Sequence, residues 1–396
     1  MRTLIPGMTS VGVMKITDIE VFVLKTSLDT PFAFSQGWVT QRSATLVRVT
    51  TENGLQGWGE AFAQGLEPPE IAAAAIEHAL KPLLVGESAL DIAVLWNTMY
   101  SRTRDYGRKG SVVAAISAVD TALWDIVGHF YQQPVYQLLG GASRTSVKPY
   151  ATGFYRINGQ NESARLADEA VQHAAAGFTA MKVKLGFGLR DDIEVMQSIG
   201  EALADPDIEL MVDTNHAYGR RDARYLGEML EQYKLRWYEE PVVPEDIDGY
   251  AELRQVLNVP IAGGENEHTC YGFNTLFQHN AVDIAQPDIG SCGGISAARD
   301  VAVLAQANGV MVNPHVWGSA IAQAASLQLL AWLPVTHHSL FAAEPILEYD
   351  LSSHPFRQDL VTEPVIMQNG IVQVPNGPGL GIEVRMDTIE QHRVRQ

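Results

Sequence analysis

Residues 181–186 read MKVKLG and place two lysines, Lys182 and Lys184, two positions apart within an apolar run. A short apolar run that is flanked by segments of helical periodicity is typical of a buried β-strand. Alternate residues of a strand point to the same side, so both lysines face the same way. Facing outward they would be buried under helices without partners, which is unfavourable. We therefore expect both side chains to point into the interior of a closed sheet.

Similar apolar runs recur from about residue 146 onward, and segments of helical periodicity separate them. The other runs are VKPYATGFY, IELMVDTN, LRWYEEP, VPIAGGEN, VDIAQPDIG and VMVNPHVWG. Strands that alternate with helices predict a parallel sheet. Seven or eight such units in this length of chain fit a closed α/β barrel. An open, doubly wound sheet is the alternative, but no glycine-rich phosphate-binding loop supports it.

The first ~140 residues have a different pattern. The segments KITDIEVFVL and SATLVRVTTENGLQGWGEAF alternate apolar and polar residues, Asn53-Gly54 is a hairpin turn signal, and helical segments follow. Strands followed by helices predict an α+β domain. We predict an α+β capping domain over residues 1–140 and a barrel over residues 141–355. The glycine- and proline-rich C-terminal segment, residues 356–396, is expected to pack back on the capping domain.

A polar residue ends each of six successive strands of the predicted barrel. The gaps between them are 29, 26, 26, 23 and 27 residues, about one β/α unit each, and the residues are Lys184, Asp213, Glu239, Glu265, Asp288 and His315. The carboxyl ends of the strands of a parallel barrel meet at one mouth, where active sites lie. We therefore expect these six side chains to share one pocket.

Three of the six are acids on successive strands: Asp213, Glu239 and Glu265. Such carboxylates would repel one another unless a cation lies between them. Oxygen ligands with room left for substrate oxygens favour Mg²⁺. Solvated loop acids are the alternative, which the regular spacing disfavours.

The remaining three residues suggest acid–base chemistry. Two ammonium groups beside a divalent cation lower each other's pKa, which would make Lys184 a neutral base with Lys182 as its helper. A structural ion pair with a neighbouring carboxylate is the alternative. Asp288 can accept the Nδ1–H of His315 and fix its tautomer, as an acid does behind a catalytic histidine.

Composition excludes several classes of protein. The 396 residues include 28 Lys+Arg and 46 Asp+Glu, and the formal charge of −18 would repel nucleic acid. Two cysteines, Cys270 and Cys292, indicate a reducing compartment rather than a disulfide framework. We see no secretory leader and expect no membrane-spanning run, so a soluble, cytoplasmic protein is predicted. Met14, which precedes the first strand directly, is a candidate natural start.

Taken together, these motifs resemble those of the enolase superfamily, mandelate racemase subgroup, and the resemblance runs from about Met14 to the PGLG stretch at residues 378–381. It implies a modified TIM barrel of (β/α)7β type with an N-terminal α+β capping domain. MKVKLG is similar to the family's K-x-K motif, whose second lysine, here Lys184, is the acid/base. VDTN, WYEEP and AGGE are similar to its metal-ligand motifs, which implies Asp213, Glu239 and Glu265 as ligands of Mg²⁺.

QPD and NPH are similar to the family's Asp–His dyad, here Asp288 and His315. PILEYD implies Glu348 as the acid that contacts the substrate carboxylate, with Glu344 as a competitor. The implied reaction removes the proton α to a carboxylate, and the metal, the lysines and a protonated Glu348 stabilise the enediolate.

The resemblance favours dehydration of a sugar acid, an aldonate or aldarate, to a 2-keto-3-deoxy acid. A racemase or epimerase is the main alternative. A lactone cycloisomerase is disfavoured, because that branch typically has a lysine where this chain has His315. A barrel without enzymatic activity is disfavoured because no metal ligand is missing. The small-molecule carboxylate is the expected partner, and homo-oligomers are usual in the family.

The predicted substrate contacts depend on position relative to the strand ends. Asn215 shares a face with Asp213, and the adjacent His216 is either a polyol contact or an ordinary loop residue. Tyr155 and Arg156 end the first barrel strand, where Arg156 could bind a second carboxylate or pair with the capping domain. Residues 30–41, TPFAFSQGWVTQ, correspond to a loop that covers the mouth in this family, which places Phe34 near substrate; interface packing is the alternative.

Overall fold

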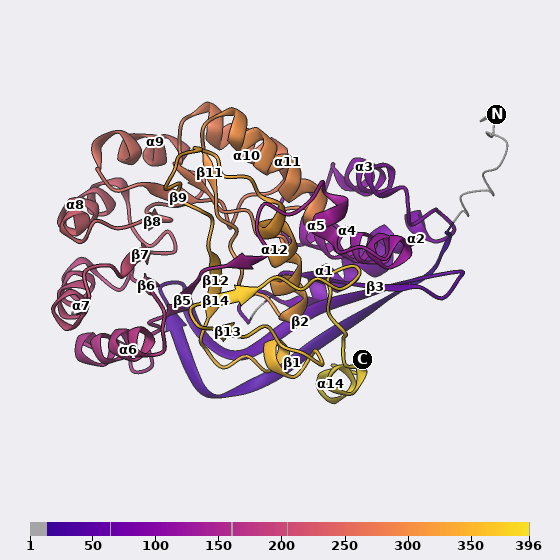
Figure 1. Ribbon diagram of the computed structural model, residues 1–396, viewed down its shortest axis with the longest axis horizontal. Helices are drawn as coiled ribbons and strands as arrows, with labels where there is room; N and C mark the ends of the chain where they lie inside the picture. Colours follow the sequence, from indigo (N-terminus) through magenta and orange to yellow (C-terminus); the bar gives the residue numbers. More distant parts are fainter. Residues whose placement is uncertain (1–13, 64, 160, 204, 396) are drawn as a thin grey trace.

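The computed structural model describes residues 14–63, 65–159, 161–203 and 205–395. An eight-stranded sheet lies at its centre, and every neighbouring pair of strands in it is parallel (Figure 1). The strands are β5 (Pro149–Gly153), β6 (Ala180–Lys184), β7 (Glu209–Asp213), β8 (Tyr238–Glu239), β9 (Ile261–Gly263), β10 (Ile284–Ala285), β11 (Met311–Val312) and β12 (Leu347–Asp350).

Seven helices separate these strands in the sequence and surround the sheet: α6 (Ser163–Ala175), α7 (Leu189–Ala202), α8 (Arg220–Leu230, followed by the short η2, Glu231–Tyr233), α9 (Ile247–Val256), α10 (Thr269–Gln278), α11 (Gly294–Ala307) and α12 (Ala320–Trp332). The predicted (β/α)7β architecture is confirmed.

Side chains join the two edge strands of the curled sheet. Among the described residues no backbone ladder links β11 to β12. Instead, Asn313 Oδ1 accepts the Ile346 N–H at 2.8 Å, and Glu348 Oε2 accepts the Val316 N–H at 2.9 Å. A predicted site residue therefore also helps to close the barrel.

The barrel interior is layered along the strand direction. A separate apolar cluster contains Tyr150, Ala180, Met211, Trp237, Ala262, Ile284 and Ile346. Two residues further along the same strands come polar side chains, such as Asp213 after Met211 and Glu239 after Trp237. Since residues i and i+2 share a face, the apolar layer lies beneath and the polar layer lies at the carboxyl ends.

The capping domain begins with an antiparallel sheet of β1 (Ile16–Phe34), β2 (Gly37–Thr51) and β3 (Gln56–Ala61). Helices follow: α1 (Pro69–Ala75), the π-helical η1 (Ile76–Leu80), α2 (Lys81–Leu84), α3 (Ile92–Thr103), α4 (Ser111–Tyr131) and α5 (Val135–Leu138). Glycines allow α4 to approach β3 closely, because a Cβ at Gly59 would lie 1.8 Å from the Ala118 carbonyl oxygen.

Residues 30–41, predicted as a loop, instead extend a hairpin. They form the end of β1, a turn at Ser35 and Gln36, and the start of β2. The reason is tertiary pairing: Ala33 exchanges backbone hydrogen bonds with Arg156 at 2.7 and 2.9 Å, which holds the hairpin against the segment that follows β5. The tip is held as well, since Gln36 Nε2 donates to the Asn215 carbonyl at 2.6 Å.

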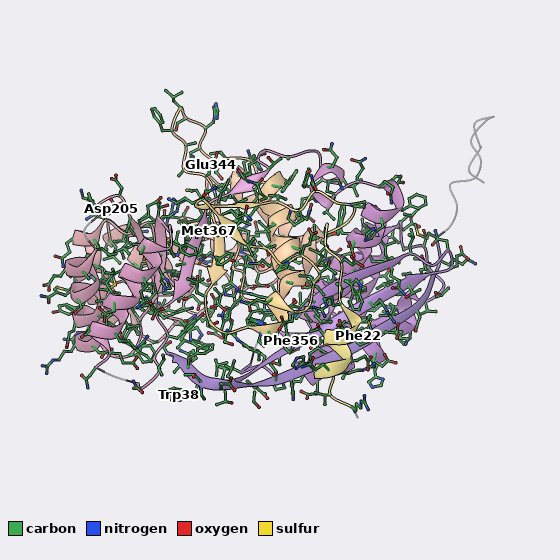
Figure 2. All side chains as sticks on the ribbon, turned by 60° about the horizontal axis from the view of Figure 1, so that its bottom comes forward. Phe22, Trp38, Asp205, Glu344, Phe356 and Met367 are labelled. Carbon is green, nitrogen blue, oxygen red and sulfur yellow. The ribbon has the colours of Figure 1, made fainter. Side chains whose placement is uncertain are left out.

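The C-terminal part returns to the first sheet. Its elements are α13 (Pro355–Gln358), β13 (Met367–Gln368), β14 (Ile371–Gln373), which pairs with β4 (Ser146–Val147), and α14 (Met386–His392). Val394 N–H donates to the Val23 carbonyl at 2.8 Å, and the Arg393 guanidinium lies 4.8 Å from the centre of the Phe22 ring. Figure 2 labels Phe22 and Phe356 beside α14. The domain limits at residues 140 and 355 stay predictions.

Helix α4 corrects one expectation. Its 21 residues are long and apolar enough, by length and composition, to cross a membrane, whereas no such run was expected. In the fold, 83% of its most apolar window is buried inside the protein, and it packs against β3 and α11. Its apolar character is thereby accounted for by packing, since a buried core helix meets the same criteria.

A buried carboxylate on α4 joins the capping domain to the barrel. Asp120 accepts hydrogen bonds from the Ser296 N–H at 2.9 Å and the Ser296 hydroxyl at 2.6 Å, in the first turn of α11. Burial raises the pKa of Asp120 to about 7, although the hydrogen bonds from Ser296 oppose the rise. The folded state therefore holds the proton more tightly than the unfolded state does.

From this follows a pH-dependent stability. The contribution of Asp120 is most favourable below its ordinary pKa of 3.8 and is lost as the pH rises from about 4 through 7. The difference corresponds to at most about 4 kcal/mol. We expect Asp120→Asn to raise the Tm by about 2–5 °C relative to wild type at pH 8, and by less at pH 5.

Differential scanning calorimetry at both pH values measures the effect. Asp105→Asn, at an exposed position, is the control and should leave the difference between the two pH values unchanged. A Tm that falls at pH 8 in Asp120→Asn would contradict the expectation.

Candidate active site

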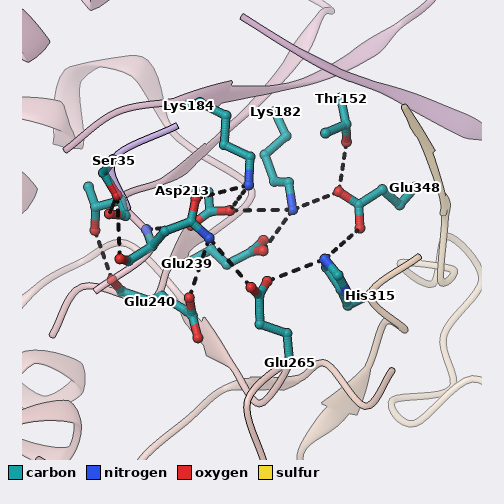
Figure 3. Close-up of polar contacts among 12 residues, drawn as sticks. Ser35, Thr152, Lys182, Lys184, Asp213, Glu239, Glu240, Glu265, His315 and Glu348 are labelled. Atoms are coloured by element: carbon teal, nitrogen blue, oxygen red, sulfur yellow. Dashed lines mark hydrogen bonds and ion pairs between the residues drawn. The ribbon is translucent and has the colours of Figure 1, made fainter. Parts of the chain in front are cut away.

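Three carboxylates gather at the carboxyl ends of β7, β8 and β9. Asp213, Glu239 and Glu265 each offer one oxygen atom, and these atoms lie within 4.8 Å of one another (Figure 3). Asp213 and Glu239 are fully buried, and Glu265 is partly exposed. These strand-end acids lie close together, as predicted, because their strands are parallel neighbours in the sheet.

The carboxylate group fits a hard divalent cation. Mutual repulsion is visible in Glu239, whose pKa rises to about 8 through burial and the charges of Asp213 and Glu265, although Lys182 opposes the rise. Glu265 Oε2 is buried and accepts no hydrogen bond. Three carboxylates with one oxygen left free of hydrogen bonds form an all-oxygen donor set, the kind that Mg²⁺ prefers.

Both lysines of MKVKLG point into the barrel, as predicted. Lys182 Nζ lies 2.7 Å from Glu239 Oε1 and 2.9 Å from Glu348 Oε1. Lys184 Nζ lies 2.5 Å from Asp213 Oδ2 and 3.1 Å from Asn215 Oδ1. The ion pair that was the alternative interpretation is therefore present as well.

The neutral state predicted for Lys184 requires a bound cation and stays a prediction, because without one the surrounding carboxylates favour the charged amine. Burial lowers the pKa of Lys184, but Asp213 and the other carboxylates outweigh this effect and raise it above its usual value. The same balance raises the pKa of Lys182. The prediction counted the positive neighbours, whereas the structure places more negative ones around each amine.

His315 and Asp288 form the predicted pair. His315 Nδ1 lies 2.7 Å from Asp288 Oδ2, and Nε2 faces the carboxylates, 3.5 Å from Glu265 Oε2. Burial lowers the pKa of His315, but Glu265, Glu348 and Asp288 raise it overall to about 10. Figure 3 shows Lys184 beside Asp213 and His315 beside Glu265 and Glu348, so the two groups contact different carboxylates of the site.

Glu348 belongs to the site, but the prediction that it is protonated is wrong. Donors surround both of its oxygens: Thr152 Oγ1 at 2.9 Å, Lys182 Nζ at 2.9 Å and the Val316 N–H at 2.9 Å. Burial raises the pKa of Glu348, but Lys182 and His315 lower it well below its usual range. The competing Glu344 is exposed and lies at a projecting loop (Figure 2), 3.7 Å from Arg144.

A cavity of about 360 Å³ opens onto these residues. Four of the predicted substrate contacts line it: Phe34, Tyr155, Asn215 and His216. An apolar wall that was not predicted lies beside them, formed by Phe62, Leu66 and Trp317, and the Phe34 and Trp317 rings meet edge to face at 5.9 Å. The described lining residues also include Gln36, Ser111, Asn266, His268 and Ser291.

Arg156, the fifth predicted contact, is not among the described residues that line this cavity. Its guanidinium is buried, lies 2.5 Å from Asp191 and covers the Phe187 ring at 4.6 Å. The prediction of a second carboxylate site at Arg156 is wrong in this structure. The alternative of an ion pair holds, but the partner is at the start of α7 rather than in the capping domain.

Two supporting residues were missed by the sequence analysis. Trp237 Nε1 and Gln286 Nε2 donate to Glu239 Oε2 at 2.8 and 2.7 Å. Together with Lys182 on Oε1, they fix both oxygens of Glu239. A signal was present, because Trp237 precedes Glu239 by two residues and Gln286 precedes Asp288 by two, so each shares the inward face.

Comparison with known families decides the affiliation. Residues 18–140 match the N-terminal domain of the mandelate racemase and muconate lactonizing enzyme family, and residues 165–388 match the enolase C-terminal domain-like family. The chain belongs to the enolase superfamily, in the mandelate racemase subgroup. The resemblance recognised in its motifs is confirmed.

Enolase superfamily relatives differ in the activity that their names state. D-galactarolactone cycloisomerase of Agrobacterium fabrum is 39% identical, with 96% of this chain and 99% of that protein covered. Arabinonate dehydratase of Saccharolobus solfataricus is 34% identical, with 88% and 90% covered.

Solved structures of the superfamily share the fold. The 3,6-anhydro-D-galactonate cycloisomerase of Zobellia galactanivorans is 38% identical, with 96% of this chain and 100% of that chain covered and a TM-score of 0.86. A racemase of Streptomyces coelicolor A3(2) with bound magnesium is 28% identical, with 96% and 100% covered and a TM-score of 0.85. The chain is therefore similar along nearly its whole length to cycloisomerases, a dehydratase and a racemase.

Proposed function

We propose that this chain catalyses Mg²⁺-dependent removal of the proton α to the carboxylate of a sugar acid, followed by loss of the oxygen on the β-carbon. One observation carries the proposal: two acid/base groups reach the three-carboxylate group from different strands, since Lys184 on β6 contacts Asp213 and His315 after β11 lies 3.5 Å from Glu265 (Figure 3). An acid or base on each face of one carbon suits proton removal on one side and proton delivery on the other.

Each residue has a proposed role. Asp213, Glu239 and Glu265 would hold Mg²⁺, which would supply positive charge that stabilises the enediolate and lowers the pKa of Lys184. Lys184 takes the α-proton, and Lys182 adds positive charge beside the developing oxyanion.

Asp288 fixes His315, which delivers a proton to the leaving oxygen. Glu348, ionised by its donors, orients Lys182 and the backbone after His315.

Dehydration is the first form of this reaction. The α C–H bond breaks, the electron pair forms the C=C bond of an enol, and the C–O bond to the β-hydroxyl breaks. The hydroxyl takes the proton from His315 and leaves as water, and the enol becomes a 2-keto-3-deoxy acid. The similarity to arabinonate dehydratase supports this form.

Cycloisomerisation is a second candidate, favoured by the similarity to two cycloisomerases at 38 and 39% identity. If the leaving oxygen belongs to a lactone or anhydro ring, the same elimination opens the ring and releases no water. The sequence disfavoured a cycloisomerase because His315 stands where a lysine is typical. Ring opening by elimination needs no lysine at that position, so His315 does not disfavour this route. Each form ends in a 2-keto-3-deoxy acid.

The test is a screen of aldonates, aldarates, their lactones and anhydro acids with Mg²⁺, in which semicarbazide traps the 2-keto product. A product lighter than its substrate by one water identifies a dehydratase, and a product of equal mass identifies a cycloisomerase. Deuterium from D₂O at the α-carbon without any keto product would instead identify a racemase or epimerase. No product and no exchange with any acid would refute the proposal.

A further inference from the structure

The end of β3, in the capping domain, contacts the backbone that follows His315. Glu60 is buried, and its carboxylate accepts the Ser319 N–H at 3.0 and 3.1 Å and the Ala322 N–H at 3.2 Å. It also accepts the Ser319 hydroxyl at 2.5 Å. Ser319 caps the N-terminus of α12 and lies four residues after His315. A carboxylate from another part of the chain thus fixes the start of this helix, where negative charge is favourable.

The same end of β3 also contacts the loop that carries Asp288. The Phe62 N–H donates to the Gly290 carbonyl at 2.9 Å, and the Gly290 N–H donates to Asp288 Oδ1 at 2.7 Å. The Phe62 ring centre lies 5.9 Å from that of His315. A Cβ at Gly290 would lie 3.2 Å from Asp288 Oδ1 and 3.3 Å from the Phe62 nitrogen, so the three segments are closely packed.

We propose that Glu60 is a positioning residue for His315. It holds residues 316–319 at the start of α12, and this backbone sets where the imidazole lies above the substrate carbon. Lys184 is independent of this contact, because it is placed by β6 and by its bonds to Asp213 and Asn215. The inference rests on the proposed function, in which His315 and Lys184 act on opposite faces.

The expected effect of losing Glu60 is selective for one face of the substrate. A displacement of about 1 Å in a reacting group can reduce its rate by about 100-fold. We therefore expect Glu60→Ala to slow proton exchange by His315 about 100-fold and to leave exchange by Lys184 within about threefold. Glu60→Gln can keep its carbonyl oxygen at the Oε2 position, where it still accepts from the Ser319 hydroxyl and from the Ser319 and Ala322 N–H groups, and it should recover part of the loss.

The experiment measures deuterium uptake from D₂O, in the presence of Mg²⁺, into each enantiomer of an α-hydroxy acid analogue. The analogue has no oxygen on its β-carbon, so elimination cannot occur. Lys184→Ala and His315→Asn establish which enantiomer reports on which base. Asp125→Ala is the matched control. Asp125 is a buried capping-domain carboxylate that also accepts two backbone N–H groups, from Trp58 at 2.9 Å and Leu380 at 2.8 Å, neither of which belongs to the segments that carry His315 and Asp288.

A selective loss in Glu60→Ala, absent from Asp125→Ala and partly recovered in Glu60→Gln, supports the inference. An equal fall on both faces, no fall, or the same selectivity in Asp125→Ala overturns it. If the wild type exchanges neither enantiomer, the screen of sugar acids decides the proposed function, and a second measurement decides the positioning. The NMR signals of the His315 ring, assigned by their loss in His315→Asn, must then move in Glu60→Ala and not in Asp125→Ala; unmoved signals overturn it.

Discussion

Lys184→Ala should reduce exchange of the substrate α-proton by at least about 1,000-fold, within the range that general bases contribute. The amine is the basic group placed by β6 beside the three carboxylates, and alanine offers no replacement. Mg²⁺ binding should survive, because the variant removes a positive charge from beside Asp213 and leaves all three acids in place. Deuterium incorporation measured by NMR, together with Mg²⁺ titration by calorimetry, tests both expectations.

Lys184→Arg is the matched control, since it keeps the positive charge next to Asp213 but cannot act as a base at neutral pH. We expect it to be nearly as inactive as the alanine variant, which separates loss of the base from loss of the charge. Exchange that persists in Lys184→Ala within about tenfold of wild type would move the base to His315.

Glu239→Gln should weaken Mg²⁺ binding by at least about 100-fold. The substitution removes one negative charge from the proposed metal site, and it also disturbs the hydrogen bonds around Glu239. Lys182, Trp237 and Gln286 all donate hydrogen bonds to its two oxygens. A glutamine must turn its own amide N–H toward at least one of these donors, which leaves buried donors facing each other. We therefore also expect a lower Tm.

The control is the adjacent Glu240, which is equally buried but does not belong to the three-carboxylate group. Its Oε1 accepts from Asn266 at 2.8 Å, so Glu240→Gln can keep this bond through its carbonyl oxygen. Calorimetric titration should show a much smaller change for Glu240→Gln. Unchanged affinity in Glu239→Gln would refute the assignment of Glu239 as a ligand.

The amino-acid sequence by itself determined the barrel and the gathering of its strand-end residues. Each β/α unit has its own apolar run and amphipathic helix, and parallel strands bring equivalent positions to one mouth. The spacing of Asp213, Glu239 and Glu265 therefore predicted their proximity without knowledge of any contact. The i, i+2 relation likewise predicted that Lys182 and Lys184 point inward.

Only the tertiary structure decided the electrostatics of the site. Lys184 was expected to be neutral beside Lys182 and a bound cation; without the cation its pKa follows the net balance of the charges around it, and these come from four strands. Glu348 was expected to be protonated, whereas Thr152, Lys182 and Val316 converge on it from three separate segments. No local pattern reveals such a balance.

Long-range contacts also determined the positions and partners of Arg156 and Glu60. The sequence placed Arg156 at a strand end, but Asp191 and Phe187 hold it away from the cavity. Nothing in residues 56–61 marked Glu60, whose partners Ser319 and Ala322 lie about 260 positions further along the chain. Sequence periodicity indicates which face of a helix or strand is buried. It does not indicate which residue contacts that face, because this depends on how the two domains pack.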